Sequence, residues 1–279
     1  MRYVEVKEVK ETVKRLFLQA NLELGEGVLE ALKRAREEEK NALAKRTLDL
    51  LIENALFAKA EGLPICQDTG LAIVIMEIGQ GIAFKGGSLR EAVEEGVREA
   101  YSEGFFRKSV CHPFSRKNTG DNTPVILHLE VTEGDKVRVI VFPKGGGSEN
   151  KSLAQVLPPY AGREGVVEFV LKTVKEAGPD PCPPLIIGVG IGGNLETSSL
   201  LAKKALLRPL GKPNPDPELQ GLEEEILRKV NALGIGPQGF GGMTTALACH
   251  VMLMPCHIAS LPVSVNLQCH AHRWKEAYL

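Results

Sequence analysis

The sequence has no long hydrophobic run, no excess of charge of either sign and few cysteines, and each absence excludes a class of protein. No stretch of about 20 uninterrupted apolar residues occurs among its 279 residues, and the N-terminus has no apolar secretory core. The formal net charge is -1 and Lys and Arg form no long run, so nucleic acid finds no basic surface. We therefore expect a soluble, cytoplasmic protein that binds neither nucleic acid nor membrane.

A disulfide framework is also absent. Such frameworks belong to small secreted domains, whereas this chain is long, has no signal peptide and contains only six cysteines. Reduced thiols serve instead as metal ligands, nucleophiles or core residues. Cys249 stands in an apolar run, where cysteine behaves as a small hydrophobic residue, and we expect Cys249 and Cys111 to be structural.

The composition that remains is typical of a globular protein, with 43% hydrophobic and 25% charged residues. We expect a mixed α/β (α+β) fold in one compact domain spanning residues 1–279. Its helical part, about residues 1–62, would form a layer packed on mixed β-sheets built from about residues 63–279. Three prolines within residues 212–217 prevent both helix and strand, and we interpret this segment as a surface loop.

Hydrophobic periodicity predicts the main elements. Helices are predicted over residues 6–20, 44–56, 88–103, 165–177, 195–206 and 218–233, with Ser88 as an N-cap. Strands are predicted over residues 71–78, 185–189, 248–254 and 261–267. Residues 125–131 and 137–142 flank a turn sequence and predict a β-hairpin.

Two glycine-rich segments invite comparison with phosphate-binding loops. Gly188, Gly190 and Gly193 satisfy GxGxxG, but the second strand ending in an acid that a dinucleotide site requires is missing. We expect a turn whose amides approach some other anion. In residues 144–151, three consecutive glycines leave the backbone open to a ligand, and the flanking lysines favour anion binding.

Three loop segments place a cysteine among polar residues or prolines: Cys66 in residues 65–70, Cys182 in residues 180–184 and Cys269 in residues 267–273. They are far apart, and no local CxxC pair exists. Three thiolates can hold a 4Fe-4S cluster with one open iron or, with a histidine, a zinc ion. The spacing by itself does not choose between these sites.

Five motifs together carry a resemblance to a known family. In chain order they are residues 65–70, 118–122, 144–151, 182–184 with the glycines that follow, and 269–273. Their order and content resemble class I iron-sulfur hydro-lyases, specifically the alpha subunit or N-terminal catalytic domain of class I fumarase, with the alpha subunit of L-tartrate dehydratase as a close relative. The resemblance covers about residues 10–275.

The resemblance implies a role for individual residues. Cys66, Cys182 and Cys269 match the ligands of a 4Fe-4S cluster whose fourth iron is open to substrate. The other matches are Gln67 and Arg107 for substrate binding, Gly146 in the glycine run that lines the substrate, Asp68 as a proton donor or acceptor, and His257 as an active-site histidine. Family members often have arginine where this chain has Cys256, which we interpret as a neutral substitution.

The resemblance also implies a reaction and a partner. The expected activity is reversible addition of water to a dicarboxylate, most simply fumarate to (S)-malate as in the tricarboxylic acid cycle, with tartrate dehydration as the alternative. Because a second domain follows in the single-chain family members and this sequence stops at Leu279, we expect a separate beta subunit and an α2β2 heterotetramer.

Two other classes stay open at this point. A zinc or mononuclear iron enzyme could use the C-terminal thiols and histidines, namely Cys249, Cys256, His257, Cys269, His270 and His272. A redox iron-sulfur carrier would use the three loop cysteines but would not need Asp68 or a glycine cradle.

Overall fold

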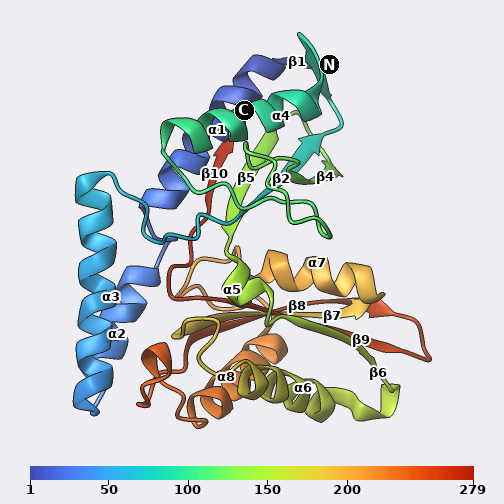
Figure 1. The fold of residues 1–279 in the computed structure, drawn as a ribbon. Helices are drawn as coiled ribbons and strands as arrows, with labels where there is room; N and C mark the ends of the chain where they lie inside the picture. The colour runs from blue at the N-terminus through green and yellow to red at the C-terminus, as the bar shows by residue number, and fades with distance from the viewer. The chain divides into compact units, whose positions relative to one another are not determined.

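The computed structural model describes residues 1–279, and its eight α-helices and three β-sheets confirm the mixed α/β class (Figure 1). The chain divides into two compact units. Unit 1 comprises Met1–Gly25, Ala55–Gly146 and Arg273–Leu279, and unit 2 comprises Glu26–Asn54 and Gly147–His272. Each unit has its own sheet and its own set of buried apolar side chains, where the sequence predicted one domain. None of the helices has the length and apolar character needed to cross a membrane.

Unit 1 is built on a four-stranded sheet in the order β10-β5-β2-β4. Its elements are β1 (Arg2–Glu5), α1 (Val6–Leu22), β2 (Leu71–Gly79), β3 (Ile82–Lys85), α4 (Leu89–Glu103), β4 (Ile126–Thr132), β5 (Val137–Lys144) and β10 (Lys275–Tyr278). Helix α1 packs against α4 and β5 through an apolar stripe that includes Val13 and Phe17, as its periodicity predicts. Ser88 caps α4, because its Oγ accepts the amide of Glu91 at 3.4 Å.

The predicted hairpin of β4 and β5 is wrong, because β2 lies between these strands. Strand β2 pairs with β4 in parallel and with β5 antiparallel. It is apolar on both faces and is largely buried, which suits a central position in a sheet. The connection between β4 and β5 crosses the end of β2, where a Cβ on Gly79 would lie only 2.6 Å from the Gly134 oxygen. Glycine at position 79 therefore permits the crossing.

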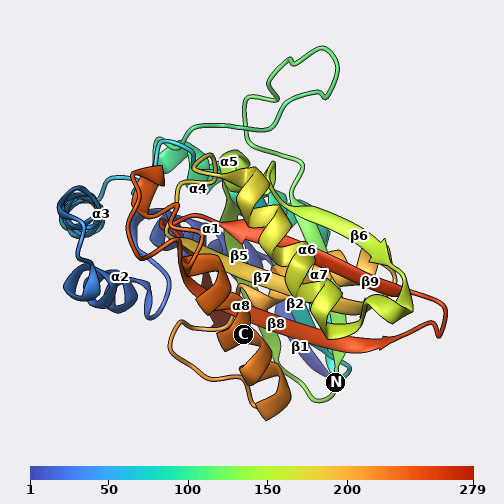
Figure 2. The same cartoon turned by 90° about the horizontal axis from the view of Figure 1, so that it is seen from below.

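Unit 2 contains a second four-stranded sheet, in the order β6-β9-β7-β8. Its elements are α2 (Val28–Glu38), the first part of α3 (Ala42–Glu61), β6 (Leu153–Leu157), α6 (Gly162–Ala177), β7 (Leu185–Gly193), α7 (Leu195–Ala205), α8 (Pro217–Asn231), β8 (Ala246–Cys256) and β9 (Leu261–Gln268). Helices α6 and α8 cover one face of this sheet and α7 covers the other (Figures 1 and 2). The short helix α5 (Gly146–Glu149) lies at the covalent junction of the two units.

The glycine-rich turn predicted after residues 185–189 does not form. Strand β7 continues to Gly193, and Gly188 and Gly190 lie within it. A Cβ on Gly188 would lie 2.1 Å from the Ala202 oxygen, and one on Gly190 would lie 2.0 Å from the Ser198 oxygen. These two glycines therefore allow α7 to approach the sheet, and a dinucleotide or anion role for them is wrong.

Candidate functional site

The loop that carries Cys66 joins α3 to β2 in unit 1 and places Asp68 beside the glycine segment. Cys66 and Asp68 are half-buried, and Gln67 is exposed. The Asp68 Oδ2 atom accepts the amide of Gly146 at 2.7 Å, and Oδ1 accepts the amide of Gly70 at 3.0 Å. Two backbone donors thus fix the orientation of the Asp68 carboxylate. The Gly146 amide, predicted to meet an anion, contacts this carboxylate.

Three buried side chains donate hydrogen bonds to the backbone of this loop. The Tyr101 hydroxyl donates to the Thr69 carbonyl oxygen at 2.6 Å. Burial raises the pKa of the Tyr101 phenol, which therefore stays protonated as a donor. Asn122 Nδ2 donates to the Gly70 carbonyl oxygen at 3.2 Å, and Arg273 Nη2 donates to the backbone carbonyl oxygen of Asp68. The loop backbone is therefore fixed on both sides of Asp68.

Arg107 lies next to the loop that carries Cys66 and Asp68 in unit 1. Its side chain is exposed, and its carbonyl oxygen accepts the Thr69 hydroxyl at 2.8 Å. Two residues on, the Ser109 amide donates to Asn122 Oδ1 at 2.7 Å. The motif of residues 118–122 therefore ties the Arg107 segment to the Cys66 loop. Unit 1 thus brings together Cys66, Gln67, Asp68, Gly146 and the Arg107 segment.

Unit 2 brings two of the three predicted ligand cysteines into adjacent loops. Cys182 precedes β7 and is exposed, and Cys269 follows β9 and is half-buried. The His270 amide donates to the Cys182 oxygen at 3.3 Å, and Gln238 Nε2 donates to the Pro183 oxygen at 2.7 Å. Cys182 has a φ of 56°, a left-handed conformation that is uncommon outside glycine and is often found at functional sites. None of the six cysteines forms a disulfide.

His257 lies elsewhere in unit 2. It is exposed in the connection that follows β8. Strand β8 runs parallel to β7 and β9 runs antiparallel, so Cys182 and Cys269 share one end of the sheet while His257 stands at the other. The nine residues of β7, at roughly 3.3 Å each, separate the two ends by roughly 25 Å. Within one chain, His257 does not meet the cysteine pair.

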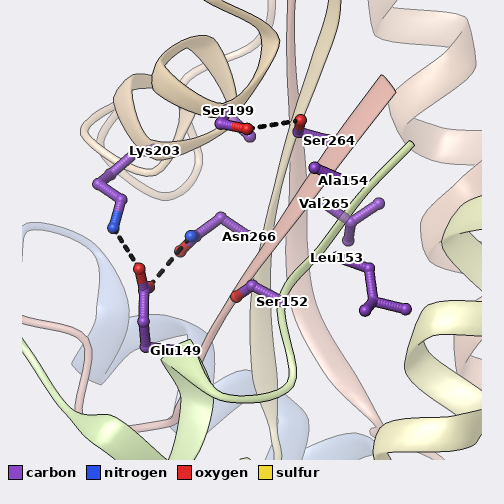
Figure 3. Close-up of a pocket in the computed structure, with 10 residues that line it drawn as sticks. Glu149, Ser152, Leu153, Ala154, Ser199, Lys203, Ser264, Val265 and Asn266 are labelled. Atoms are coloured by element: carbon purple, nitrogen blue, oxygen red, sulfur yellow. Dashed lines mark hydrogen bonds and ion pairs between the residues drawn. The ribbon is translucent and has the colours of Figure 1, made fainter. Parts of the chain in front are cut away.

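The other end of α5 is fixed within unit 2 by a polar network (Figure 3). Ser148 Oγ donates to Gln268 Oε1 at 3.1 Å, directly before Cys269 in the sequence. The Glu149 carboxylate pairs with Lys203 Nζ at 2.7 Å and accepts from Asn266 Nδ2 at 3.2 Å. Glu149, Lys203 and Asn266 line a cavity of about 200 Å³ between α7, β6 and β9. The glycine segment is therefore held through Asp68 at Gly146 and through β9 and α7 at its C-terminal end.

The lysines around this glycine segment do not all face a ligand. Lys144 is almost fully buried, and Lys151 pairs with Asp180 at 2.6 Å. Both had been expected to attract an anion.

The structure gathers no group of three His, Cys, Asp or Glu side chains that could hold a metal ion. Cys66 belongs to unit 1, and Cys182 and Cys269 belong to unit 2. Cys249 is buried in the unit 2 core and burial raises the pKa of its thiol, which confirms its structural role. The donors of the zinc alternative are likewise dispersed, since Cys249 is in the core and His257 is at the far end of the sheet from Cys269.

Several residues that shape the site were not predicted. Arg273 stands within the fifth motif, so its position could have indicated a role. Tyr101 appears in the sequence only as part of an amphipathic helix, and no sequence signal distinguishes Gln238 from other loop residues.

Comparison with known proteins identifies the family. A sequence model of the fumarate hydratase (Fumerase) family matches residues 10–278. A protein of Methanocaldococcus jannaschii named putative L(+)-tartrate dehydratase subunit alpha is 42% identical over 272 residues, 95% of each chain. The L(+)-tartrate dehydratase subunit alpha of Escherichia coli (strain UTI89) is 31% identical over 272 residues, 96% of this chain and 89% of its own. These matches place the chain among the hydro-lyases. It belongs to the fumarate hydratase family.

Proposed function

We propose that this chain is the alpha subunit of a 4Fe-4S-dependent hydro-lyase that adds water to fumarate to give (S)-malate, reversibly. The observation that carries the proposal is the contact between the Cys182 and Cys269 loops, because it brings two thiols of the proposed ligand set to one end of a sheet. The orientation of Asp68 by the Gly146 amide supports it from unit 1. A second candidate, dehydration of L(+)-tartrate, is supported by the names of the relatives.

The residues present fit a cluster with one open iron. Cys66, Cys182 and Cys269 all lie on loops, are exposed or half-buried, and are not consumed in disulfides. Three thiolates are the ligand set that leaves one iron of a 4Fe-4S cluster without a protein ligand. Once bound, such a cluster would supply a Lewis acid for a substrate oxygen.

The chain's own side chains would bind the substrate and move a proton. The exposed Arg107 guanidinium would pair with a substrate carboxylate, and the exposed Gln67 amide would donate to its oxygens. Asp68, held by two amides, would accept or donate the proton at the substrate carbon, which requires a fixed carboxylate within hydrogen-bond reach. Amides of the glycine segment other than that of Gly146, which Asp68 accepts, would face the negative charge that develops on the substrate carboxylate.

A role for His257 at the same site requires a second copy of the chain. Within one chain, its position at the opposite end of the unit 2 sheet prevents it from meeting Cys182 and Cys269. We propose that His257 acts on the site of a neighbouring copy in an α2β2 assembly.

We also propose that a separate beta subunit completes the active site. The support is the designation of both relatives as alpha subunits, together with alignment over 95% and 89% of their lengths.

Activity measured anaerobically with and without the cognate beta subunit tests the function. We expect hydration of fumarate and dehydration of (S)-malate by the two subunits together and none by the alpha chain alone. Turnover of L(+)-tartrate with no turnover of fumarate would select the second candidate. A reconstituted two-subunit enzyme that cycles between redox states but acts on none of these substrates would replace the hydro-lyase with an electron carrier.

A further inference from the structure

A second cavity in unit 2 has no role in the proposed reaction. It measures about 240 Å³ and lies between α2, α8, the start of β8 and the loop that follows α7. The charged and polar side chains in its wall include Arg34, Arg208, Lys212, Glu223, Glu224 and His250. None of them was assigned to the cluster or the dicarboxylate. Cavities for drug-sized ligands span about 300–1,000 Å³, so an occupant of this cavity is smaller.

The two acidic side chains of this wall already accept hydrogen bonds from other residues of the chain. Glu223 is 5% exposed, and its Oε1 accepts from Asn214 Nδ2 and from the Val251 amide, both at 2.7 Å. Its Oε2 pairs with Arg208 Nη2. Glu224 accepts from Gln220 Nε2 at 2.7 Å. The carboxylates therefore use much of their capacity within the wall.

The cations of the wall keep capacity for a ligand. Arg208 Nη2 forms an ion pair with Glu223, and the buried Arg208 Nε has no hydrogen-bond partner. Arg34 is exposed and forms no ion pair, and Lys212 approaches only Glu26, at 3.9 Å. A buried guanidinium donor without a partner costs free energy that an acceptor would recover. The cavity thus offers donors and positive charge.

His250 adds a neutral hydrogen-bond acceptor to this wall. The side chain is 4% exposed, and Nδ1 lies 3.1 Å from the Ala205 oxygen. A carbonyl oxygen only accepts, so Nδ1 carries the proton and Nε2 is the acceptor of the neutral ring. Burial, and secondarily the charge of Arg208, lower the pKa of His250 to about 4, which keeps the ring neutral near pH 7. The hydrogen bond to Ala205 is the one that the structure gives the His250 side chain, and it uses Nδ1.

We propose that this cavity binds a small oxyanion that carries an O–H group, such as hydrogen phosphate or a small hydroxycarboxylate. Arg34, Arg208 and Lys212 would bind its negative oxygens, and His250 Nε2 would accept its hydroxyl proton. The proposal is independent of the hydro-lyase activity, since it concerns binding to the chain without cluster, substrate or beta subunit.

Calorimetric titration of the full chain with matched pairs of anions tests the proposal. Near pH 7.5, phosphate carries an O–H group and sulfate does not, and L-lactate differs in the same way from propionate. We expect phosphate to bind about tenfold more tightly than sulfate, about 1.4 kcal/mol, and lactate more tightly than propionate. Sodium chloride at equal ionic strength should not compete. Tighter binding of phosphate than of lactate would identify a phosphate site, and the reverse a hydroxycarboxylate site.

Variants locate the binding. Replacing the exposed cations (Arg34→Met with Lys212→Met) should weaken phosphate binding about tenfold or more, whereas the control Lys33→Met, exposed on the same helix, should leave it unchanged. His250→Leu should remove the preference for phosphate over sulfate, and His250→Gln, which keeps an acceptor, should retain part of it. If the His250 variants do not fold, the double variant at the exposed residues Arg34 and Lys212 still tests whether phosphate binds in this cavity. Equal affinity for phosphate and sulfate, or unchanged binding in the double variant, would overturn the proposal.

Discussion

At the scale of single residues, the contact that matters most is that of Asp68 with Gly146. The two residues are far apart in the sequence, and no pattern predicts their hydrogen bond. The resemblance assigned both to the substrate region, but it did not show that one amide of the glycine segment orients the acid. A Cβ at Gly145 would lie 3.2 Å from Asp68 Oδ2, so the absence of a side chain there helps the carboxylate to approach the segment.

Asp68→Asn should therefore reduce the rate. The amide cannot accept the substrate proton, and its single oxygen can accept only one of the Gly70 and Gly146 amides that Asp68 accepts. Loss of a positioned acid or base typically costs about 10²–10⁴-fold in kcat. Anaerobic kinetics with the beta subunit measure this effect, and Asp135→Asn, an exposed site in unit 1, is the control. A rate within about twofold of the unaltered enzyme would remove Asp68 from the mechanism.

His250 predicts a pH dependence of stability. Its pKa is about 4 in the fold and 6.5 when exposed, so the unfolded chain binds a proton that the folded chain does not. The contribution of the neutral ring is fully present above about pH 6.5 and is lost as the pH falls towards about 4, by at most roughly 3 kcal/mol. Urea unfolding at several pH values should show a smaller loss for His250→Gln than for the unaltered chain. An identical pH dependence would contradict the assignment.

At the scale of elements, sequence patterns identified most segments but not their neighbours. Periodicity predicted α1, α7 and β2 because apolar side chains repeat at the spacing of the element that buries them. The insertion of β2 between β4 and β5 depends on which strand edge pairs best, and a local pattern does not contain that information. The GxGxxG motif predicted a turn where β7 continues, because glycine is needed both in a tight turn and where a helix packs closely against a strand.

The role of Gly190 can be tested by adding one methyl group. Its Cβ would meet backbone of α7 at 2.0 Å, so Gly190→Ala should destabilise the fold by about 2 kcal/mol or more, as overpacking does. Gly221→Ala is the matched control, because Gly221 lies in α8 with no atom within 4 Å, and alanine should be neutral or stabilise the helix by up to about 1 kcal/mol. Urea denaturation measures both, and equal stabilities of the two variants would refute close packing at Gly190.

At the scale of the whole molecule, the residues proposed for the site are divided between the two compact units. Cys66, Asp68 and Arg107 belong to unit 1, and Cys182 and Cys269 belong to unit 2. The expectation of one domain rested on the proline segment 212–217, since the one helix and two strands predicted after it are too few for an independent core. The separation of His257 from the cysteine pair follows from strand direction, which the sequence does not reveal.

Complementation between copies tests the placement of His257. We expect Cys182→Ser and His257→Ala each to inactivate the assembly when expressed alone with the beta subunit. When the two variants are co-expressed, half of the randomly formed pairs are mixed and each mixed pair has one complete site. Activity should therefore return to about one quarter of the unaltered level in a twofold-symmetric assembly. No recovery would contradict the contribution of His257 from a second copy.

The central claim is that Cys66, Cys182 and Cys269 hold an iron-sulfur cluster, and metal and sulfide analysis after anaerobic reconstitution tests it most directly. The unaltered chain and the control Cys256→Ser, an exposed cysteine at the far end of the unit 2 sheet, should each bind about four iron and four sulfide. Cys66→Ser, Cys182→Ser and Cys269→Ser should each lose most of this content. Zinc bound without sulfide, or full cluster occupancy in Cys182→Ser, would contradict the account.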